Sequence, residues 1–457
     1  MNCSLARLTD HDIYITRLTD SNSITMGRKK CAIFLKIMVS LVRNPLLKIC
    51  ANIKVSPMKQ TITCFPEKVP LKYIQRYLQR YILEHIIGRV LRWPLEETWL
   101  QPTDLIYNSC RCAIYQYLSH INKAHPHLTT KPLVLIPSLH CRSQVEAALA
   151  ASYTTSFYRV NRDLTVNEAD VVRYVQGHSG LVVLCLVHYY GFPPAGLNIR
   201  HLLNYTHHPL FILEDGAHGL FSPIGHVGDA SVYSLSKSLP VRDGGVLRLC
   251  QDHPPIGLHP TPSPWSFVAQ LNPVIKAILK ATPLYTIRSL IKTTLTRRLA
   301  ARNTTVTQPN KHVEKMFTAA HANVPAAPLT HVVISQLSQA TAHVREYRQR
   351  NFTYLAQHVS NLPNIKPLFA SYRKEFEMGV SPLAFPIITS NRDRLESRLA
   401  DEGIITFAFG REPHKSLNMH DIPETQWLMD HTLALPCHQD LSQTDLQRIV
   451  TAVIRSI

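Results

Sequence analysis

The chain has 457 residues, of which 45% are hydrophobic and 18% are charged, proportions that exclude a wholly disordered protein and allow a large buried core. Its net charge of +18 is concentrated in residues 1–60 and 271–315, which carry surpluses of seven and eight positive charges. Because the rest of the chain is nearly neutral, the sequence argues against a nucleic-acid-binding protein, and leaves open whether the two basic stretches contact anionic ligands or a membrane surface.

The N-terminal region predicts no transmembrane segment. The apolar stretch 31–50 is interrupted by Lys36 and Arg43, short of the roughly 20 apolar residues that a span requires. It could form an amphipathic surface helix or a leader without fixed structure, and Met58 is a second candidate for the initiator. The ten cysteines form no CxxC pair, so we expect reduced thiols, no metal site and a cytoplasmic protein.

The first regular elements indicate an α/β fold. Apolar residues at helical spacing predict a helix over 71–91, and a polar turn with Ser109 near the N-cap leads into a second helix that ends near 122. Short apolar runs then alternate with helices predicted over 143–152 and 197–206. The strands predicted from these runs cover residues 133–137, 180–188, 210–215, 230–235 and 245–249. Runs that are apolar on both faces are typical of a mostly parallel sheet covered by helices.

The pattern changes after residue 250. A proline-rich connector (252–265) precedes a basic helical stretch and an irregular one over 303–330. A long helix over 329–362 leads into the last part of the chain, where we expect strands at 383–389 and 433–436 and helices at 392–403 and 441–454. The domains expected from these changes are a basic leader (1–57), a large α/β domain (58–265), a helical basic connecting segment (266–335) and a small α+β domain (336–457).

Polar side chains gather where three of the predicted strands end. They are Glu214, Asp215 and His218; Ser234, Ser236 and Lys237; and Ser138, His140 and Cys141. Ligands of parallel α/β sheets bind at the carboxyl ends of the strands, so these three groups are candidates for one site.

Lys237 and Asp215 allow two interpretations. They could form a buried ion pair, which requires nothing beyond the two residues. Alternatively, a lysine amine in a dry pocket is a nucleophile for a carbonyl carbon, and a nearby carboxylate can hold a pyridinium nitrogen protonated. The second interpretation describes a pyridoxal phosphate site, and the spacing alone leaves both open.

Several motifs in order resemble one enzyme family. Residues 214–218 (EDGAH), 228–234 (GDASVYS), 236–237 (SK) and 244–245 (GG) resemble the core of the DegT/DnrJ family of pyridoxal-phosphate-dependent sugar aminotransferases, and 433–454 resembles its closing segment. The resemblance implies the aspartate-aminotransferase fold: a three-layer large domain with a mostly parallel central sheet, followed by a small α+β domain. It also implies a homodimer.

The resemblance further implies roles for individual residues. Lys237 would form the internal aldimine and move the proton, and Asp215 would pair with the pyridine nitrogen. His218 would lie beside the phenolic oxygen, and Ser234 would bind the phosphate. The turn formed by Ser109, Cys110 and Arg111 would bind the phosphate through backbone N–H groups. For His218, Ser234 and Ser109, purely structural roles remain open.

The chain departs from the family at three places. The family's Phe-His-x-Ser/Thr-Lys approach to the lysine is shortened here to Leu235-Ser236-Lys237. Cys141 stands where relatives often have an aromatic residue over the ring, so His140 is a candidate for covering it. Residues 324–331 lack the Asn and Arg with which relatives complete the partner subunit's site.

We therefore retain two functions. The first is an aminotransferase that moves an amino group from glutamate or a similar donor to a keto-sugar, with a nucleotide-linked sugar as the expected acceptor. The second is a catalytically degenerate scaffold or regulatory protein of the same fold. Family members that dehydrate sugars carry His in place of the aldimine lysine. Because this chain has Lys237, a dehydratase is disfavoured.

Overall fold

The computed structural model describes residues 62–64, 100–101, 103–250, 317–322, 324–327, 330–331, 333–334 and 341–457. These residues belong to one compact unit. The expected leader (1–57), the helix expected over 71–91 and the basic helical stretch expected over 266–300 lie outside the described residues. The domain boundaries expected from the sequence remain predictions.

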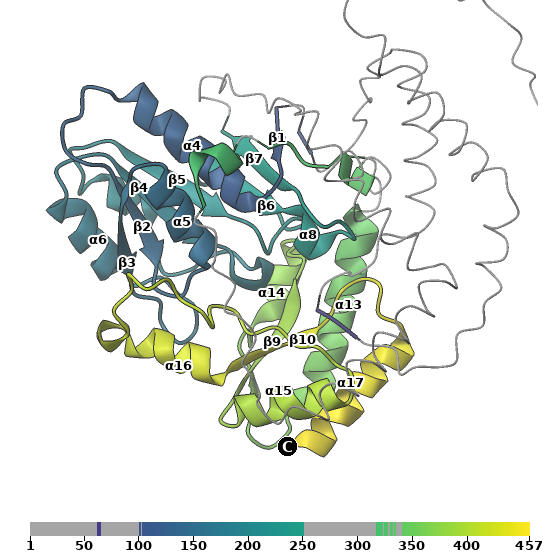
Figure 1. Ribbon diagram of the computed structural model, residues 1–457. Coiled ribbons are helices and arrows are strands. Elements are labelled where there is room, and N and C mark those ends of the chain that lie inside the picture. The colour runs from purple at the N-terminus through teal and green to yellow at the C-terminus, as the bar shows by residue number, and fades with distance from the viewer. Residues whose placement is uncertain are drawn as a thin grey trace, which may run out of the picture. The chain divides into compact units, whose positions relative to one another are not determined.

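A seven-stranded sheet organises residues 105–249 (Figure 1). Its strands are β1 (Leu105–Tyr107), β2 (Leu133–Pro137), β3 (Thr154–Tyr158), β4 (Val182–Val187), β5 (Leu210–Asp215), β6 (Ala230–Ser234) and β7 (Gly245–Leu249). Their order is β1-β7-β6-β5-β4-β2-β3. The pairs from β3 to β6 are parallel, and β7 is antiparallel to both β6 and β1. The expected mostly parallel sheet is confirmed.

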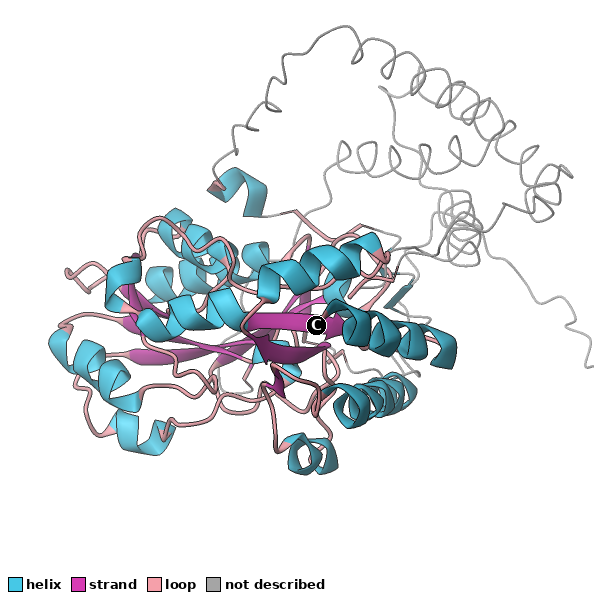
Figure 2. Ribbon diagram, turned by 90° about the horizontal axis from the view of Figure 1, so that it is seen from below, coloured by secondary structure: helices cyan, strands magenta, loops and turns pink. Residues whose placement is uncertain are grey.

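Helices cover both faces of this sheet, because its central strands are apolar on both sides. Every residue of β2, β4 and β6 is buried. Figure 2 shows the strands between helices, which makes the expected three-layer arrangement. The helices in this part of the chain are α4 (Cys110–Ala124), α5 (Arg142–Ala150), α6 (Glu168–Gly177), α7 (Ile199–Leu203) and α8 (Leu235–Ser238). α4 packs on β6 and β7, whereas α5 packs on β2 and β3.

The last part of the chain forms a second, smaller sheet. Its antiparallel strands β8 (Ile365–Pro367), β9 (Ala384–Thr389) and β10 (Thr432–Pro436) lie in the order β10-β9-β8. The helices here are α11 (Ala319–Ala322), α13 (Thr341–Val359), α14 (Tyr372–Glu377), α15 (Arg392–Asp401), α16 (Pro423–His431) and α17 (Gln443–Ser456). α13 packs against β9, α15 packs against β10, and both contact α17. The small α+β part expected at the C-terminus is thus confirmed.

Three local expectations differ from the structure. Residues 105–107, expected within a polar turn, form β1 and pair with β7. Residues 319–322, expected to be irregular, form α11. β3 was not expected, because TTSFY is an edge strand in which only Tyr158 is fully buried, so its pattern lacks the continuous apolar run of the central strands.

The parallel strands bring their carboxyl ends to one edge of the sheet. Val187 ends β4 beside Asp215, which ends β5, and Asp215 pairs in turn with Val232 of β6. β6 ends two residues later at Ser234, and α8 follows at once. The register therefore places the acid of one strand next to the lysine segment of its neighbour.

Candidate active site

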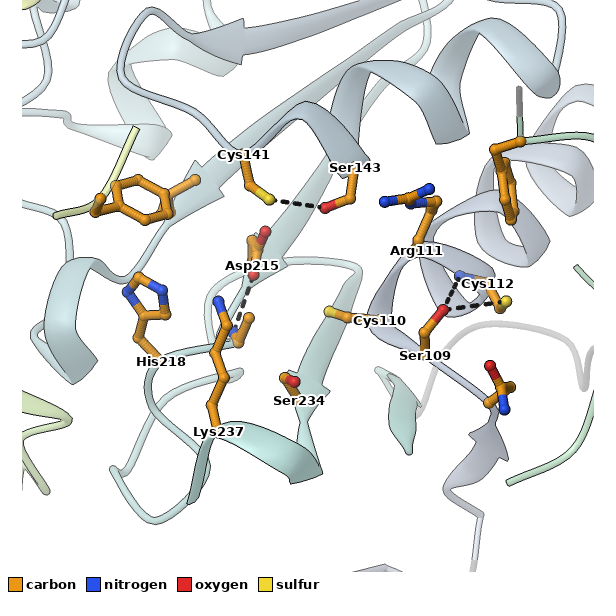
Figure 3. A pocket seen from close by; sticks show the side chains of 15 residues that line it. Ser109, Cys110, Arg111, Cys112, Cys141, Ser143, Asp215, His218, Ser234 and Lys237 are labelled. Atoms are coloured by element: carbon orange, nitrogen blue, oxygen red, sulfur yellow. Dashed lines mark hydrogen bonds between the residues drawn. The ribbon is translucent and has the colours of Figure 1, made fainter. Parts of the chain in front are cut away.

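A cavity of about 570 Å³ opens at this edge of the large sheet (Figure 3). Its volume is within the range of small-molecule sites. The lining residues come from the α4 start, the α5 start, the ends of β4 to β6, and two later segments. Eight of the nine expected site residues line it: Ser109, Cys110, Arg111, Cys141, Asp215, His218, Ser234 and Lys237.

Asp215 is a buried carboxylate whose two oxygens both accept hydrogen bonds. The backbone N–H of Ala217 donates to Oδ1 over 2.9 Å, and the side-chain amide of Gln144 donates to Oδ2. Only 6% of Asp215 is exposed. Because both bonded groups are N–H donors, Asp215 presents a hydrogen-bond acceptor to the cavity.

Lys237 lies on α8 and is half-buried. Figure 3 shows its side chain extending toward Asp215. Among the residues that the structure describes, neither a hydrogen bond nor an ion pair holds its amine. A closed Lys237–Asp215 ion pair, the alternative left open by the sequence, is therefore not formed, and the amine remains accessible from the cavity.

His218 is a buried, neutral imidazole. Burial, and then the charge of Lys237, lowers the pKa of His218 well below its usual value. Its Nδ1 accepts the backbone N–H of Tyr190 over 3.1 Å, so the single proton of the neutral ring is on Nε2. Tyr190 has a φ of 56°, in the left-handed region that is costly for a non-glycine residue. His218 consequently offers the cavity one hydrogen-bond donor.

The first turn of α4 forms the end of the cavity that suits an anion. Ser109 is the N-cap and accepts the N–H of Cys112 over 3.3 Å, while the preceding N–H groups of the turn have no helical partner. Gly245 of β7 packs directly against this turn, and a Cβ there would overlap the backbone of Ser109 and Cys110. The Gly-Gly motif thus allows β7 to approach the helix start. Ser234, 7% exposed, adds a hydroxyl.

Among the expected site residues, the Arg111 side chain is engaged in an ion pair and Cys110 is a neutral thiol. The Arg111 guanidinium forms an ion pair of 2.7 Å with Glu146 and lies 5.5 Å from the Phe317 ring centre. Cys110 also lines the cavity, and burial, followed by the charge of Asp215, raises the pKa of its thiol well above the usual value. Cys110 is therefore a neutral wall of the site and not a competing nucleophile.

His140 does not line the cavity, so the expected covering of the ring by His140 is not found. Its ring stacks on Phe157 with centroids 5.0 Å apart, its Nδ1 donates to the Ser138 carbonyl, and its Nε2 accepts the His414 N–H. Neighbouring side chains of an extended segment point to opposite sides, so Cys141 faces the cavity and His140 faces away. Burial lowers the pKa of His140 to about 4.

Gln144 and Phe409 are among the residues around the site that sequence motifs did not identify. Gln144 contacts Asp215 from the first turn of α5, and no spacing rule connects them. Phe409 lines the cavity from a segment between α15 and α16, almost 270 residues after Cys141. An aromatic residue is thus present in the cavity although Cys141 is not aromatic.

The segment 324–331, which lacks the expected Asn and Arg, is tied to the α4 start. Asn108 donates its backbone N–H to the Val324 carbonyl over 2.8 Å. Asp243 accepts the Ala327 N–H over 2.7 Å, the Asn108 amide over 3.3 Å and the Thr330 hydroxyl. Asp243 therefore fixes this segment beside the anion end of the cavity.

Comparison with known structures shows the fold. TlmJ of Streptoalloteichus hindustanus, an aminotransferase, is 17% identical, with a TM-score of 0.58 over 86% of this chain and 98% of that one. Helicobacter pylori PseC, an aminotransferase of pseudoaminic acid biosynthesis, is 12% identical, with a TM-score of 0.57 over 87% and 99%. DesI, solved with its TDP-sugar product, is 16% identical, with a TM-score of 0.58 over 89% and 95%. No curated protein sequence matches.

The sequence itself also matches a family. The model of the DegT/DnrJ/EryC1/StrS aminotransferase family matches residues 326–454, which include the small sheet. This match and the fold confirm the resemblance that the motifs around Lys237 indicated. Residues 326–454 thus match the DegT/DnrJ/EryC1/StrS aminotransferase family, whose members depend on pyridoxal phosphate, and the described part of the chain has the fold of solved sugar aminotransferases.

Proposed function

We propose that the protein is a pyridoxal-phosphate-dependent aminotransferase that transfers an amino group from glutamate or a similar donor to a keto-sugar. The observation that carries the proposal is the pairing in one cavity of a partner-free Lys237 amine, as far as the described residues show, with the doubly hydrogen-bonded Asp215 carboxylate. If Lys237 and Asp215 formed an ion pair with each other, neither group would be available to a ligand. Their separation leaves each available to a ligand.

The residues present fit the cofactor by the chemistry of their donors and acceptors. Asp215 offers an acceptor for a protonated ring nitrogen, and His218 offers the Nε2–H for a phenolic oxygen. The N–H groups of the α4 turn and the Ser234 hydroxyl suit the phosphate. Lys237 is the amine that would bind the aldehyde carbon covalently.

The roles of the chain's own groups follow from these positions. When bound, the cofactor supplies an electron-poor ring that accepts an electron pair from the substrate's α-carbon. The Asp215 carboxylate would accept the hydrogen of a protonated ring nitrogen. Lys237 Nζ would accept the proton from the substrate's α-carbon and would return it later in the transfer. Cys110, Cys141 and Phe409 limit access of water to this reaction.

A nucleotide-linked acceptor is supported by one of the similar structures, DesI, which was solved with a TDP-sugar product.

We also propose a cytoplasmic homodimer. The similar structures are aminotransferases, and enzymes of this fold build their sites at a two-fold interface. The seven cysteines among the described residues are free thiols, as is usual in a reducing compartment. In the described part of the chain, no helix is long and apolar enough to cross a membrane.

Borohydride reduction after incubation with pyridoxal phosphate tests the function. We expect a visible absorption band, and then a pyridoxyl adduct on Lys237 in peptide mass spectrometry. Lys237→Ala should remove both, and glutamate should change the band of the wild type in a half-reaction. A colourless wild type without an adduct would reject the enzyme and leave the degenerate scaffold. An adduct without response to glutamate would leave a cofactor-binding protein with another donor.

A further inference from the structure

Gln144 is a buried polar residue that the expected site did not include. It is 2% exposed and lies in the first turn of α5, three residues after the N-cap Cys141. Its Nε2 donates to Asp215 Oδ2, and its Oε1 accepts the backbone N–H of Cys141 over 3.4 Å. The side chain thus connects the start of α5 to the acid at the end of β5.

We infer that Gln144 is a positioning residue that holds the Asp215 carboxylate aimed at a ring nitrogen of the ligand. The inference rests on the proposed function, because it concerns how Asp215 meets an aromatic cofactor. Gln144 itself does not line the cavity, so it acts through Asp215.

The orientation of the amide is fixed by its two partners. The reverse orientation would set Oε1 against the Asp215 carboxylate, with two acceptors facing each other, and the NH₂ group against the Cys141 N–H, with two donors facing each other. The structure therefore allows only one assignment, in which Gln144 is a donor to the acid.

Both groups that are hydrogen-bonded to Asp215 are donors, so Asp215 acts only as an acceptor toward them. The Ala217 N–H engages Oδ1 and the Gln144 amide engages Oδ2, and neither group can accept a proton from the acid. Each carboxylate oxygen retains a further lone pair. A carboxylate held in this way can still accept one N–H from a ligand.

The contact also fixes the position of Asp215 across the sheet. Gln144 follows β2, whereas Asp215 ends β5, and β4 lies between these two strands. A side chain that reaches from the helix over β2 to the end of β5 restricts the carboxylate in a direction that the Ala217 N–H, two residues away in the chain, does not.

Gln144→Glu and Gln144→Leu separate this role from simple packing. Both keep nearly the same volume. The glutamate variant keeps an acceptor for the Cys141 N–H but sets a second carboxyl against Asp215, where like charge raises the pKa of the pair. The leucine variant removes the donor without adding charge. Gln116→Leu is the matched control: Gln116 is also buried (5% exposed), but its amide donates to the Ala322 carbonyl, outside the cavity.

The probes are pyridoxal 5′-phosphate and its deaza analogue, in which a C–H replaces the ring nitrogen. We expect the wild type to prefer pyridoxal phosphate by about tenfold to a hundredfold, the worth of one charge-assisted hydrogen bond. In both Gln144 variants this ratio should fall at least fivefold toward one, whereas Gln116→Leu should keep it. Fluorescence titration gives both dissociation constants, and circular dichroism gives the folded fraction.

The ratio separates failure of the inference from failure of the proposed function. A wild type that forms the Lys237 adduct, with folded Gln144 variants that keep its ratio, overturns the inference alone. A wild type that binds neither probe rejects the function and the inference together. If only one variant folds, that variant decides. If neither folds, Gln144 acts on the fold, and the inference is also overturned.

Discussion

At the residue scale, Phe409 gives the cavity an aromatic wall. Its ring makes edge contacts with His218 at 4.9 Å and with Tyr189 at 5.7 Å between centroids. Tyr189 donates its hydroxyl hydrogen to the Leu139 carbonyl over 2.5 Å, two residues before Cys141. Phe409 is thereby held next to the residues that frame Asp215, in a place where a flat heterocycle would contact it.

Phe409→Leu should weaken pyridoxal phosphate binding by about twofold to tenfold, because an aromatic contact contributes roughly 0.5–1.5 kcal/mol beyond its buried area. The dissociation constant from fluorescence titration measures the effect. Phe407→Leu is the control, since Phe407 also packs on His218, at 5.7 Å, but does not line the cavity. Equal losses in both variants would show that Phe409 acts only through His218.

At the scale of elements, the end of β5 carries two acids with different tasks. Strand alternation directs Glu214 and Asp215 to opposite faces. Glu214 accepts Nε2–H of His188 over 2.8 Å and the N–H groups of Gly225, Val227 and Gly228. It therefore fixes the loop from β5 to β6, on which the register of Lys237 against Asp215 depends.

Glu214 should make stability depend on pH at acid pH. Burial alone would raise its pKa, but the hydrogen bonds from His188 and from the loop lower it from 4.5 to about 2. A depressed pKa contributes stability that is present above pH 4.5 and is lost as the pH falls toward 2; the difference corresponds to roughly 3 kcal/mol. Urea unfolding of wild type and Glu214→Gln should differ by about this amount at pH 6, and the gap should close near pH 2. A constant gap would contradict the assignment.

The elements that could be predicted from the sequence are those whose own residues show a hydrophobic pattern. β4 and β6 are apolar on both faces because helices cover both, so a continuous run identifies them. β1 and β8 have three residues each, too few for a periodicity, and β3 lies at an edge. Their pairing depends on neighbours far along the chain, such as β7 for β1.

At the scale of the whole molecule, the site residues also divide into those that a local sequence pattern identifies and those that only packing between distant segments brings to the site. Asp215 and Lys237 were found because they follow neighbouring strands within 23 positions, and a family motif covers both. Gln144 and Phe409 reach the site through packing between elements that no local pattern connects. His140 was expected over the ring because it adjoins Cys141, which replaces an aromatic residue of the relatives, but its side chain stacks on Phe157.

Because the cavity is lined by residues from both the large sheet's edge and the segment carrying Phe409, a ligand in it should stabilise these parts jointly. A ligand at a hundred times its dissociation constant adds about 2.7 kcal/mol to the folded state. We therefore expect saturating pyridoxal phosphate to raise the Tm by roughly 5 °C in a scanning calorimeter. Lys237→Ala should show a smaller rise, since it keeps the contacts to Asp215 and the α4 turn but loses the covalent bond. A Tm that does not change with cofactor concentration in the wild type would mean that the cavity does not bind it.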